Sequence, residues 1–329
     1  MRTPLIPVSV LTGFLGAGKT TLLNRVLTEN HGRRIAVIEN EYGEIGIDNE
    51  LVINADEEVF EMNNGCVCCT VRGDLIRILG NLARRRDRFD YVLIETTGLA
   101  DPGPVAQTFF VDQDVRESYR LDGIITVVDA KHAWLHLDES RECQEQVAFA
   151  DRILLNKIDL VGPGDLDRLE RKIRGMNRVA EIIRSQNSAV DIDRVLNTHA
   201  FDLDAKLEHE ADFLKVIDAD AHDHRHDHEH DSEVTSVGIR EERPLDQEKV
   251  NAWMSRLLQE KGQDIFRSKG ILNIAGVAKR FVFQGVHMQF EGKADRDWRA
   301  GETRRSTMVF IGRNLDRHAL NEGFRSCLA

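Results

Sequence analysis

The sequence predicts an α/β protein with two domains, the first built on a mainly parallel sheet flanked by helices and the second a small α+β domain. Through about residue 200, short continuous apolar runs alternate with longer helical patterns, which is typical of strands buried on both faces. From 201 to 233 the composition shifts to acids and histidines, and strand and helix patterns then resume. We therefore expect a first domain over residues 1–200, an acidic His-rich linker over 201–233 and a second domain over 234–329.

The strands expected in the first domain are short and end in polar residues or glycine. In chain order they are the runs IPVSVL, RIAVIE, YVLIE, GIITVVD, RILLN and VAEII. The first is followed by a glycine-rich loop and then by a helix with an apolar face made of Leu22, Leu23, Val26 and Leu27. Buried strands that alternate with helices favour a parallel sheet covered on both faces.

The second domain begins with the strand-like run EVTSVGI and continues with an amphipathic helix. Apolar residues recur in that helix at helical spacing, at Val250, Trp253, Met254, Leu257 and Leu258. The runs GILNIAG, RFVFQGVHMQFE and STMVFIG are expected to form strands, and a final helix is expected from Asp316 to about Cys327.

The charge and cysteine content exclude several classes of protein. The formal net charge of −12 arises from 56 acidic residues against 44 Lys and Arg, and no basic stripe offers a footprint for nucleic acid. The chain begins without a secretory signal pattern and contains no stretch of roughly 18 apolar residues, so we expect no membrane span. An odd total of five cysteines argues against a disulfide scaffold. We expect a cytoplasmic protein.

The segment GFLGAGKTT at 13–21 matches the phosphate-loop pattern G-x-x-x-x-G-K-[ST] between a predicted strand and a predicted helix. Its glycines let backbone N–H groups turn toward an anion at the helix N-terminus. Lys19 is expected to reach the β- and γ-phosphates, and Thr20 is expected to bind Mg²⁺. The expected nucleotide-binding residues here are Gly13, Gly16, Ala17, Gly18, Lys19, Thr20 and Thr21.

The segment NKID places Asn156, Lys157 and Asp159 at the end of a later predicted strand. A carboxylate at Asp159 accepts hydrogen bonds from N1–H and the exocyclic amine of guanine, whereas adenine presents an acceptor at N1. We therefore expect these three residues to bind the base and to favour GTP and GDP over adenine nucleotides.

Between these two motifs, YVLIETTG ends a predicted strand with Glu95, and Gly98 follows three residues later. An acid at this place is expected to hold Mg²⁺, and the Gly98 N–H is expected to contact the γ-phosphate, so Lys19, Glu95 and Gly98 are the expected catalytic residues. The residue after Gly98 is Leu99, where Ras-type switches have the glutamine that orients the attacking water. We expect slow GTP hydrolysis that a partner or a bound metal accelerates.

The stretch NNGCVCCT places Cys66, Cys68 and Cys69 within four positions, after residues that favour a turn. Three thiolates that converge suit Zn²⁺ or a soft Cu⁺ ion. Acids at Glu39, Glu41 and Glu44 lie between the phosphate loop and these thiols and are candidates for a further oxygen ligand. The alternatives are small buried hydrophobic side chains and a redox-sensing thiol pair.

The run HDHRHDHEH alternates histidines with mostly acidic residues, at His222, His224, His226, His228 and His230. An unfolded tract of imidazoles binds divalent transition metals loosely, so we expect an accessory metal-collecting role for it. The alternative is an acidic linker in which the histidines are incidental.

Together the segments LTGFLGAGKTTLLN, VIENEYGEIGID, NNGCVCC, IETTGLADPGPV, LLNKIDL, FVFQGV and STMVFIG resemble the CobW-like P-loop GTPases, most closely the YjiA type, over nearly the whole chain. The resemblance implies a GTP-dependent metallochaperone related to nickel-insertion GTPases, with Zn²⁺ as the metal and Co²⁺, Cu⁺ or Ni²⁺ as alternatives. It implies metal ligands at Cys66, Cys68 and Cys69 with Glu39 and Glu44 nearby. It implies nucleotide contacts at Gly16 to Thr21, at Glu95 and from Asn156 to Asp159.

The expected function is therefore that of a GTP-hydrolysing metallochaperone that delivers its metal to a client apo-metalloprotein under nucleotide control. Two alternatives are a metal buffer with an uncoupled nucleotide site and a redox-regulated GTPase in which the thiols form a reversible disulfide. Homo-oligomerisation is left open by the sequence.

Overall fold

The structure of the chain is a computed structural model, and it describes residues 4–39, 59–61, 70–201 and 234–329. The chain divides into two compact units, Met1–Ile173 with Ala180–Phe201 and Arg174–Val179 with Asp202–Ala329. Each unit has its own sheet and is described by itself. Among the described residues, no helix is both long enough and apolar enough to cross a membrane.

The first unit is built on a seven-stranded sheet in the order β3-β2-β4-β1-β5-β6-β7. Every strand pair in it is parallel. The strands are β1 (Ile6–Thr12), β2 (Ile35–Glu39), β3 (Val59–Glu61), β4 (Tyr91–Glu95), β5 (Tyr119–Asp129), β6 (Arg152–Asn156) and β7 (Glu181–Arg184). The predicted parallel sheet is confirmed, and its carboxyl edge is where the candidate site lies.

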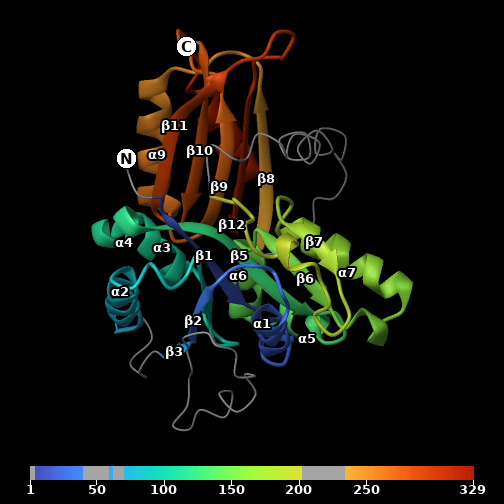
Figure 1. Cartoon of the computed structure of the whole chain (residues 1–329). Coiled ribbons are helices and arrows are strands. Elements are labelled where there is room, and N and C mark those ends of the chain that lie inside the picture. The colour runs from blue at the N-terminus through green and yellow to red at the C-terminus, as the bar shows by residue number, and fades with distance from the viewer. Residues whose placement is uncertain (1–3, 40–58, 62–69, 202–233) are drawn as a thin grey trace. The chain divides into compact units, whose positions relative to one another are not determined.

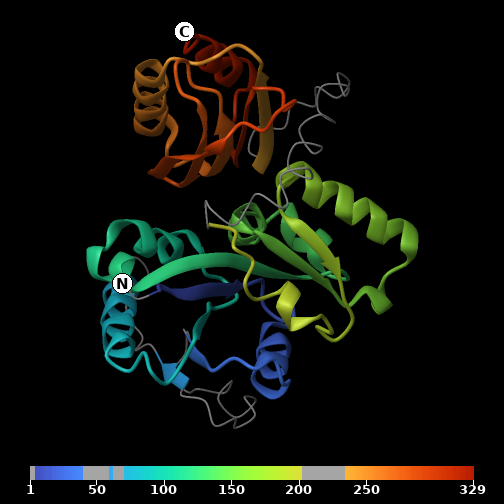
Figure 2. The same ribbon diagram turned by 45° about the horizontal axis from the view of Figure 1, so that its top comes forward.

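Helices flank both faces of this sheet, as the two views in Figure 1 and Figure 2 show. They are α1 (Lys19–Thr28), α2 (Thr70–Ala83), α3 (Gly103–Val111), α4 (Gln113–Ser118), α5 (Ala133–Leu137), α6 (Arg141–Phe149) and α7 (Pro163–Met176), with short 3-10 turns η2 (Ile158–Leu160) and η3 (Ile192–Arg194). The apolar face of α1 is buried against strand residues such as Leu11, Leu93 and Val127. Burial of this face holds the N-terminus of α1 at the edge of the sheet.

The second unit is a five-stranded antiparallel sheet in the order β11-β10-β9-β12-β8, with helices against it. Its elements are β8 (Val234–Glu241), α9 (Gln247–Lys261), β9 (Ile265–Leu272), β10 (Lys279–Val286), β11 (Gln289–Asp297), β12 (Ser306–Arg313) and α10 (Arg317–Arg325). Trp253 of α9 packs edge-on against Phe310 of β12 and Phe324 of α10. This core confirms the predicted α+β domain.

Two strand predictions in the second unit are corrected by the structure. The run RFVFQGVHMQFE forms two strands, because the chain turns at His287, whose φ is 49°, and β11 pairs back on β10. The run GILNIAG contains only the end of β9, which begins at Ile265 and includes the polar residues Arg267 and Lys269. Pairing with β10 and β12 determines the length of β9. This pairing cannot be predicted from the apolar content of the segment alone.

Candidate functional site

The loop between β1 and α1 has a backbone that favours glycine at three positions. Gly13, Gly16 and Gly18 have φ values of 143°, 70° and 111°, which side-chain-bearing residues rarely adopt. A Cβ atom on Gly13 would lie 2.3 Å from the carbonyl oxygen of Val127, and one on Gly18 would lie 2.5 Å from Nδ2 of Asn156. The glycines therefore let the loop approach β5 and β6 closely.

The N-terminus of α1 has the chemistry of an anion-binding site. Its first turn contains Lys19, Thr20 and Thr21 and no acidic residue. The first N–H groups of a helix have no acceptor within the helix, and together with the helix dipole they favour an anion. The Lys19 ammonium donates a hydrogen bond of 2.9 Å to the carbonyl oxygen of Gly13, which folds the side chain back over the loop. The structure thus brings the residues of the predicted phosphate loop together, and their contacts with a nucleotide stay a prediction.

Asn156, at the end of β6, connects the loop to a segment that the sequence analysis missed. Its side chain is 2% exposed, and Nδ2 donates to the carbonyl oxygen of Ala17 at 3.0 Å. Its Oδ1 accepts from the backbone N–H of Ser188 at 2.9 Å, and the Ser188 hydroxyl donates to the carbonyl oxygen of Gly18 at 3.0 Å. The only hint in the sequence is that the polar run SQNS begins two residues after the end of the predicted strand VAEII.

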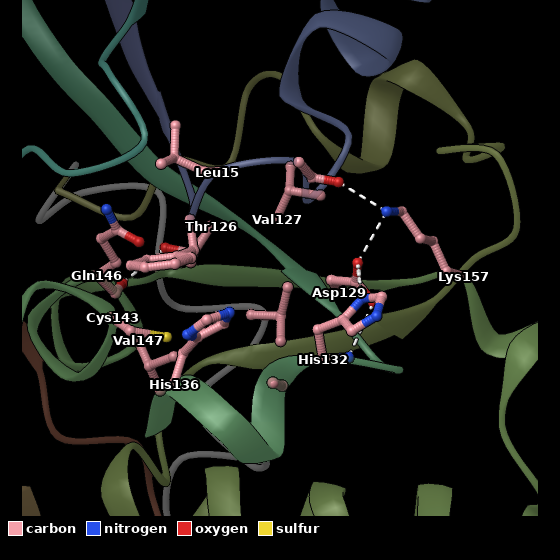
Figure 3. Close-up of a pocket in the computed structure, with 14 residues that line it drawn as sticks. Leu15, Thr126, Val127, Asp129, His132, His136, Cys143, Gln146, Val147 and Lys157 are labelled. Carbon is pink, nitrogen blue, oxygen red and sulfur yellow. Dashed lines mark hydrogen bonds and ion pairs between the residues drawn. The ribbon is translucent and has the colours of Figure 1, made fainter. Parts of the chain in front are cut away.

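Lys157 lies across the edge of the same loop. Its backbone has a φ of 60°, and its Nζ donates to the carbonyl oxygen of Gly16 and to Oδ2 of Asp129, both at 2.7 Å (Figure 3). Asp129, at the end of β5, also contacts Nδ1 of His132 at 3.0 Å. Burial alone would raise the pKa of Asp129, but the hydrogen bonds from His132 and Lys157 outweigh it and hold that pKa below its ordinary value. No local motif in the sequence predicts a role for Asp129 or His132.

Asp159 lies on the short turn η2, directly after Lys157, and its side chain is exposed. The three residues of the predicted base-binding motif therefore differ in their surroundings. Asn156 is buried and hydrogen-bonded to the loop, Lys157 is half-buried along the loop, and Asp159 presents its carboxylate to solvent. An exposed carboxylate beside a lysine stem is an arrangement that can accept hydrogen bonds from a guanine edge.

The segment after β4 packs against the phosphate loop. The Thr96 backbone N–H donates to the carbonyl oxygen of Leu11 at 2.9 Å, and the Thr96 hydroxyl donates to the Thr12 hydroxyl at 2.9 Å. A Cβ atom on Gly98 would lie 2.8 Å from the backbone nitrogen of Leu15, so only glycine fits at this distance. Gly98 is thus held against the loop that is predicted to bind the phosphates.

Glu39 and Glu95 end neighbouring strands at the same level of the sheet. The β2–β4 register pairs Glu39 with Glu95, and the β1–β4 register pairs Glu95 with Leu11. Glu39 is 5% exposed. The motifs predict different sites for these two carboxylates, one for the cargo metal and one for Mg²⁺, and the fold makes them neighbours.

The remaining predicted metal ligands lie outside the described residues. They are Cys66, Cys68, Cys69, Glu41 and Glu44, together with the accessory His222, His224, His226, His228 and His230. Within the described ranges no group of three or more His, Cys, Asp or Glu side chains is arranged to hold a metal ion. The cysteines that are described, Cys143 and Cys327, are buried, and burial raises the pKa of Cys143 to about 12 and also raises that of Cys327. Such neutral thiols are core residues.

Comparison with known families accounts for this combination of folds. The CobW/HypB/UreG nucleotide-binding domain matches residues 7–184, and the C-terminal domain of the cobalamin synthesis protein cobW matches residues 234–328. The chain belongs to the CobW family of P-loop GTPases. The family resemblance predicted from the motifs is therefore confirmed.

Relatives of the chain are similar over nearly the whole of this chain. The zinc chaperone YjiA of Escherichia coli K12 is 37% identical, over 97% of this chain and 98% of its own. The zinc-regulated GTPase metalloprotein activator 1 of Dictyostelium discoideum is 33% identical, over 98% of this chain and 80% of its own. The crystal structure of zinc-bound YjiA GTPase from E. coli superposes with a TM-score of 0.77, at 32% identity, and the match covers 99% of this chain and 100% of that chain.

Proposed function

We propose that this CobW-family GTPase is a metallochaperone that binds Zn²⁺, or a similar transition metal, through Cys66, Cys68 and Cys69 and delivers it to a client apo-metalloprotein under nucleotide control. The names of similar proteins support the metal, since they include zinc chaperones and a zinc-regulated GTPase metalloprotein activator. The client, the cytoplasmic location and the metal-collecting role of His222 to His230 are part of the proposal and rest on the sequence.

The observation that carries this proposal is the pairing of Glu39 with Glu95 on adjacent parallel strands. Neighbouring strands lie about 4.8 Å apart, so a change in the charge at one carboxylate alters the electrostatic potential at the other. If Glu39 contributes an oxygen ligand to the cargo metal and Glu95 contributes one to Mg²⁺, the two metal sites lie next to each other at the ends of β2 and β4. Binding at either site then alters the charge and position of an acid in the other.

The nucleotide half of the proposal assigns a role to each residue around the phosphate loop. Asp159 accepts from guanine, Lys157 covers the base side, and Lys19 and the N-terminus of α1 bind the phosphates. Thr20 and Glu95 supply the oxygen donors that Mg²⁺ prefers, and Mg²⁺ bound there neutralises phosphate charge. The Gly98 N–H contacts the γ-phosphate.

Hydrolysis is proposed to be slow in the isolated protein. Leu99, which follows Gly98, is 55% exposed and offers no polar group that could orient a water molecule. A client, or the cargo metal acting through Glu39, supplies the group that orients the attacking water.

A competition titration of Zn²⁺ against a chromophoric chelator tests the proposal. It is carried out under reducing conditions with protein that is free, bound to Mg·GDP, or bound to Mg²⁺ and a non-hydrolysable GTP analogue. We expect the high-affinity constant to differ by about tenfold or more between nucleotide states, which corresponds to about 1.4 kcal/mol of coupling. A constant that does not move would favour a metal buffer with an uncoupled nucleotide site.

Matched variants locate the site in the same titration. Replacement of all three of Cys66, Cys68 and Cys69 by serine is expected to remove the high-affinity site, whereas Cys143→Ser, at a buried thiol of high pKa, is expected to retain it. A variant that lacks residues 221–231 removes the loose histidine sites and is titrated in parallel. Tight stoichiometric zinc in the triple serine variant would show that the metal ligands lie elsewhere.

A further inference from the structure

Gln146 on α6 holds the segment that follows the proposed γ-phosphate contact. The side chain is 1% exposed, and Nε2 donates hydrogen bonds of 3.1 Å to the carbonyl oxygens of both Gly98 and Ala100. These bonds link residues 48 and 46 positions apart in the sequence. The amide thus connects α6 to the backbone on each side of Leu99.

Two partners determine which way the Gln146 amide faces. A flipped amide would place Oε1 against two carbonyl oxygens, so the donor end must point toward Gly98 and Ala100. Oε1 is buried and has no hydrogen-bond partner among the described residues. The donor end of the amide is therefore the end that holds the segment after β4.

The backbone of Gln146 itself is also held in place by a hydrogen bond. The Thr126 hydroxyl of β5 donates to the carbonyl oxygen of Gln146 at 2.7 Å, which anchors α6 to the central part of the sheet. The side chain lines a cavity of about 250 Å³ together with Phe14 and Leu15 of the phosphate loop and Val147 of α6 (Figure 3). Gln146 therefore lies on a rigid element and reaches a segment that packs against the phosphate loop.

We propose that Gln146 is a positioning residue for GTP recognition and hydrolysis, because it presents the Gly98 N–H to the γ-phosphate by holding the carbonyl groups of Gly98 and Ala100. The proposal rests on the role proposed above for Gly98. In this role Gln146 acts through the backbone that it holds. Its loss is therefore expected to weaken binding of the triphosphate and the chemical step, and to leave recognition of the base and of the two inner phosphates intact.

The test compares Gln146→Met with Gln144→Met in the full-length protein. Both changes remove a buried amide from α6, but Nε2 of Gln144 donates to the carbonyl oxygen of Leu137, outside the segment after β4. Affinities for GDP and for a non-hydrolysable GTP analogue are measured by titration, and kcat and KM for GTP are measured separately. We expect Gln146→Met to lower kcat and the ratio of analogue to GDP affinity by about tenfold, with GDP affinity changed less than about threefold. Gln144→Met is expected to leave both the ratio and kcat near those of the wild type.

Gly98→Ala separates failure of this inference from failure of the role given to Gly98. If Gly98→Ala lowers the affinity ratio and Gln146→Met does not, Gln146 has no positioning role and the inference is overturned. If neither variant changes the ratio, the assigned role of Gly98 is wrong and the inference fails with it. Equal losses of GDP and analogue affinity in Gln146→Met would indicate a general structural role and would also overturn the inference.

Discussion

Asp129 is the residue that joins β5 to the base side of the candidate site. Its Oδ1 accepts backbone N–H groups of Lys131 and His132 at 2.9 and 3.1 Å, while its Oδ2 accepts the Lys157 ammonium. The carboxylate is thus held by the chain that follows β5 and in turn holds Lys157 along the phosphate loop. This arrangement makes Asp129 a support for the lysine that is proposed to cover the guanine.

Asp129→Asn is expected to lower the affinities for GTP and GDP by about tenfold. The asparagine keeps one carbonyl oxygen for the backbone N–H groups but loses the charge that attracts Lys157, and hydrogen bonds to charged groups contribute about 1.5 to 3 kcal/mol. Titration with a fluorescent GDP analogue measures the change. His132→Ala removes a different partner of Asp129 and serves as the control, with less than about a threefold change expected. Nucleotide affinities that are equal in Asp129→Asn and in the wild type would contradict the supporting role.

Single residues were predictable from the sequence where a local motif carries the chemistry. Lys19, Thr20 and the loop glycines follow from one short pattern, and the φ values of Gly13, Gly16 and Gly18 give the pattern its physical reason. Ser188 and Gln146 were not predictable, because each acts through a partner more than 45 positions away and neither belongs to a local pattern.

At the scale of elements, the turn between β4 and α3 contains a carboxyl group with a raised pKa. The pKa of Asp101 is raised to about 6, chiefly by burial and also by the charge of Glu145, while the hydrogen bond from the Gly103 N–H and the charge of Arg141 act in the opposite direction. The unfolded chain titrates this group near its ordinary pKa of about 3.9. Between these two values the folded protein binds more protons at Asp101 than the unfolded chain does.

Linkage then determines the sign of the effect on stability. Because the folded state binds the extra proton, the contribution of Asp101 to the free energy of unfolding falls as the pH rises from about 4 to about 6 and stays low above that. Asp101→Asn is expected to raise the melting temperature at pH 7.5 more than at pH 4.5, because the asparagine oxygen can still accept from the Gly103 N–H at no charge cost. Circular dichroism melts at the two pH values measure this difference. A larger gain at pH 4.5 would show that burial is not the dominant cause.

Elements were predicted best where the apolar pattern is long and continuous. The run RILLN corresponds to β6 residue for residue, and GIITVVD lies within the longer β5. The start of β9 was not predicted, because its polar residues enter the sheet only through pairing with β10 and β12. The hairpin between β10 and β11 depends on the left-handed conformation of His287, and the chain has no Asn-Gly or Asp-Gly pair there to mark the turn.

At the scale of the whole molecule, the proposed metal and nucleotide sites must influence each other reciprocally. If nucleotide state changes zinc affinity by a given factor, zinc changes the relative affinities for the GTP analogue and GDP by the same factor. We expect the ratio of analogue to GDP affinity to differ by about tenfold between protein with and without one equivalent of Zn²⁺.

Glu39→Gln tests whether this coupling passes through the paired strand ends. The substitution is expected to reduce the zinc-dependent change in the affinity ratio while GDP affinity in the absence of zinc stays within about threefold of the wild type. Titrations with and without zinc measure both quantities. Full coupling in Glu39→Gln would mean that metal and nucleotide communicate by a route other than the Glu39–Glu95 pair.

The sequence by itself determined the α/β class, the phosphate loop and the CobW family resemblance, and it predicts the guanine motif and the thiol motif. Each of these features depends on residues that are close together in the chain. For such residues, the spacing and the residue types are enough to specify the local backbone geometry or the kind of ligand atom. Only the tertiary structure decided that Glu39 lies beside Glu95, that Ser188 and Asn156 join the phosphate loop, and that Gln146 holds the backbone after Gly98. The physical reason is the strand order, which inserts β4 between β2 and β1 and places β1 between β4 and β5, so that segments distant in the sequence meet at one edge of the sheet.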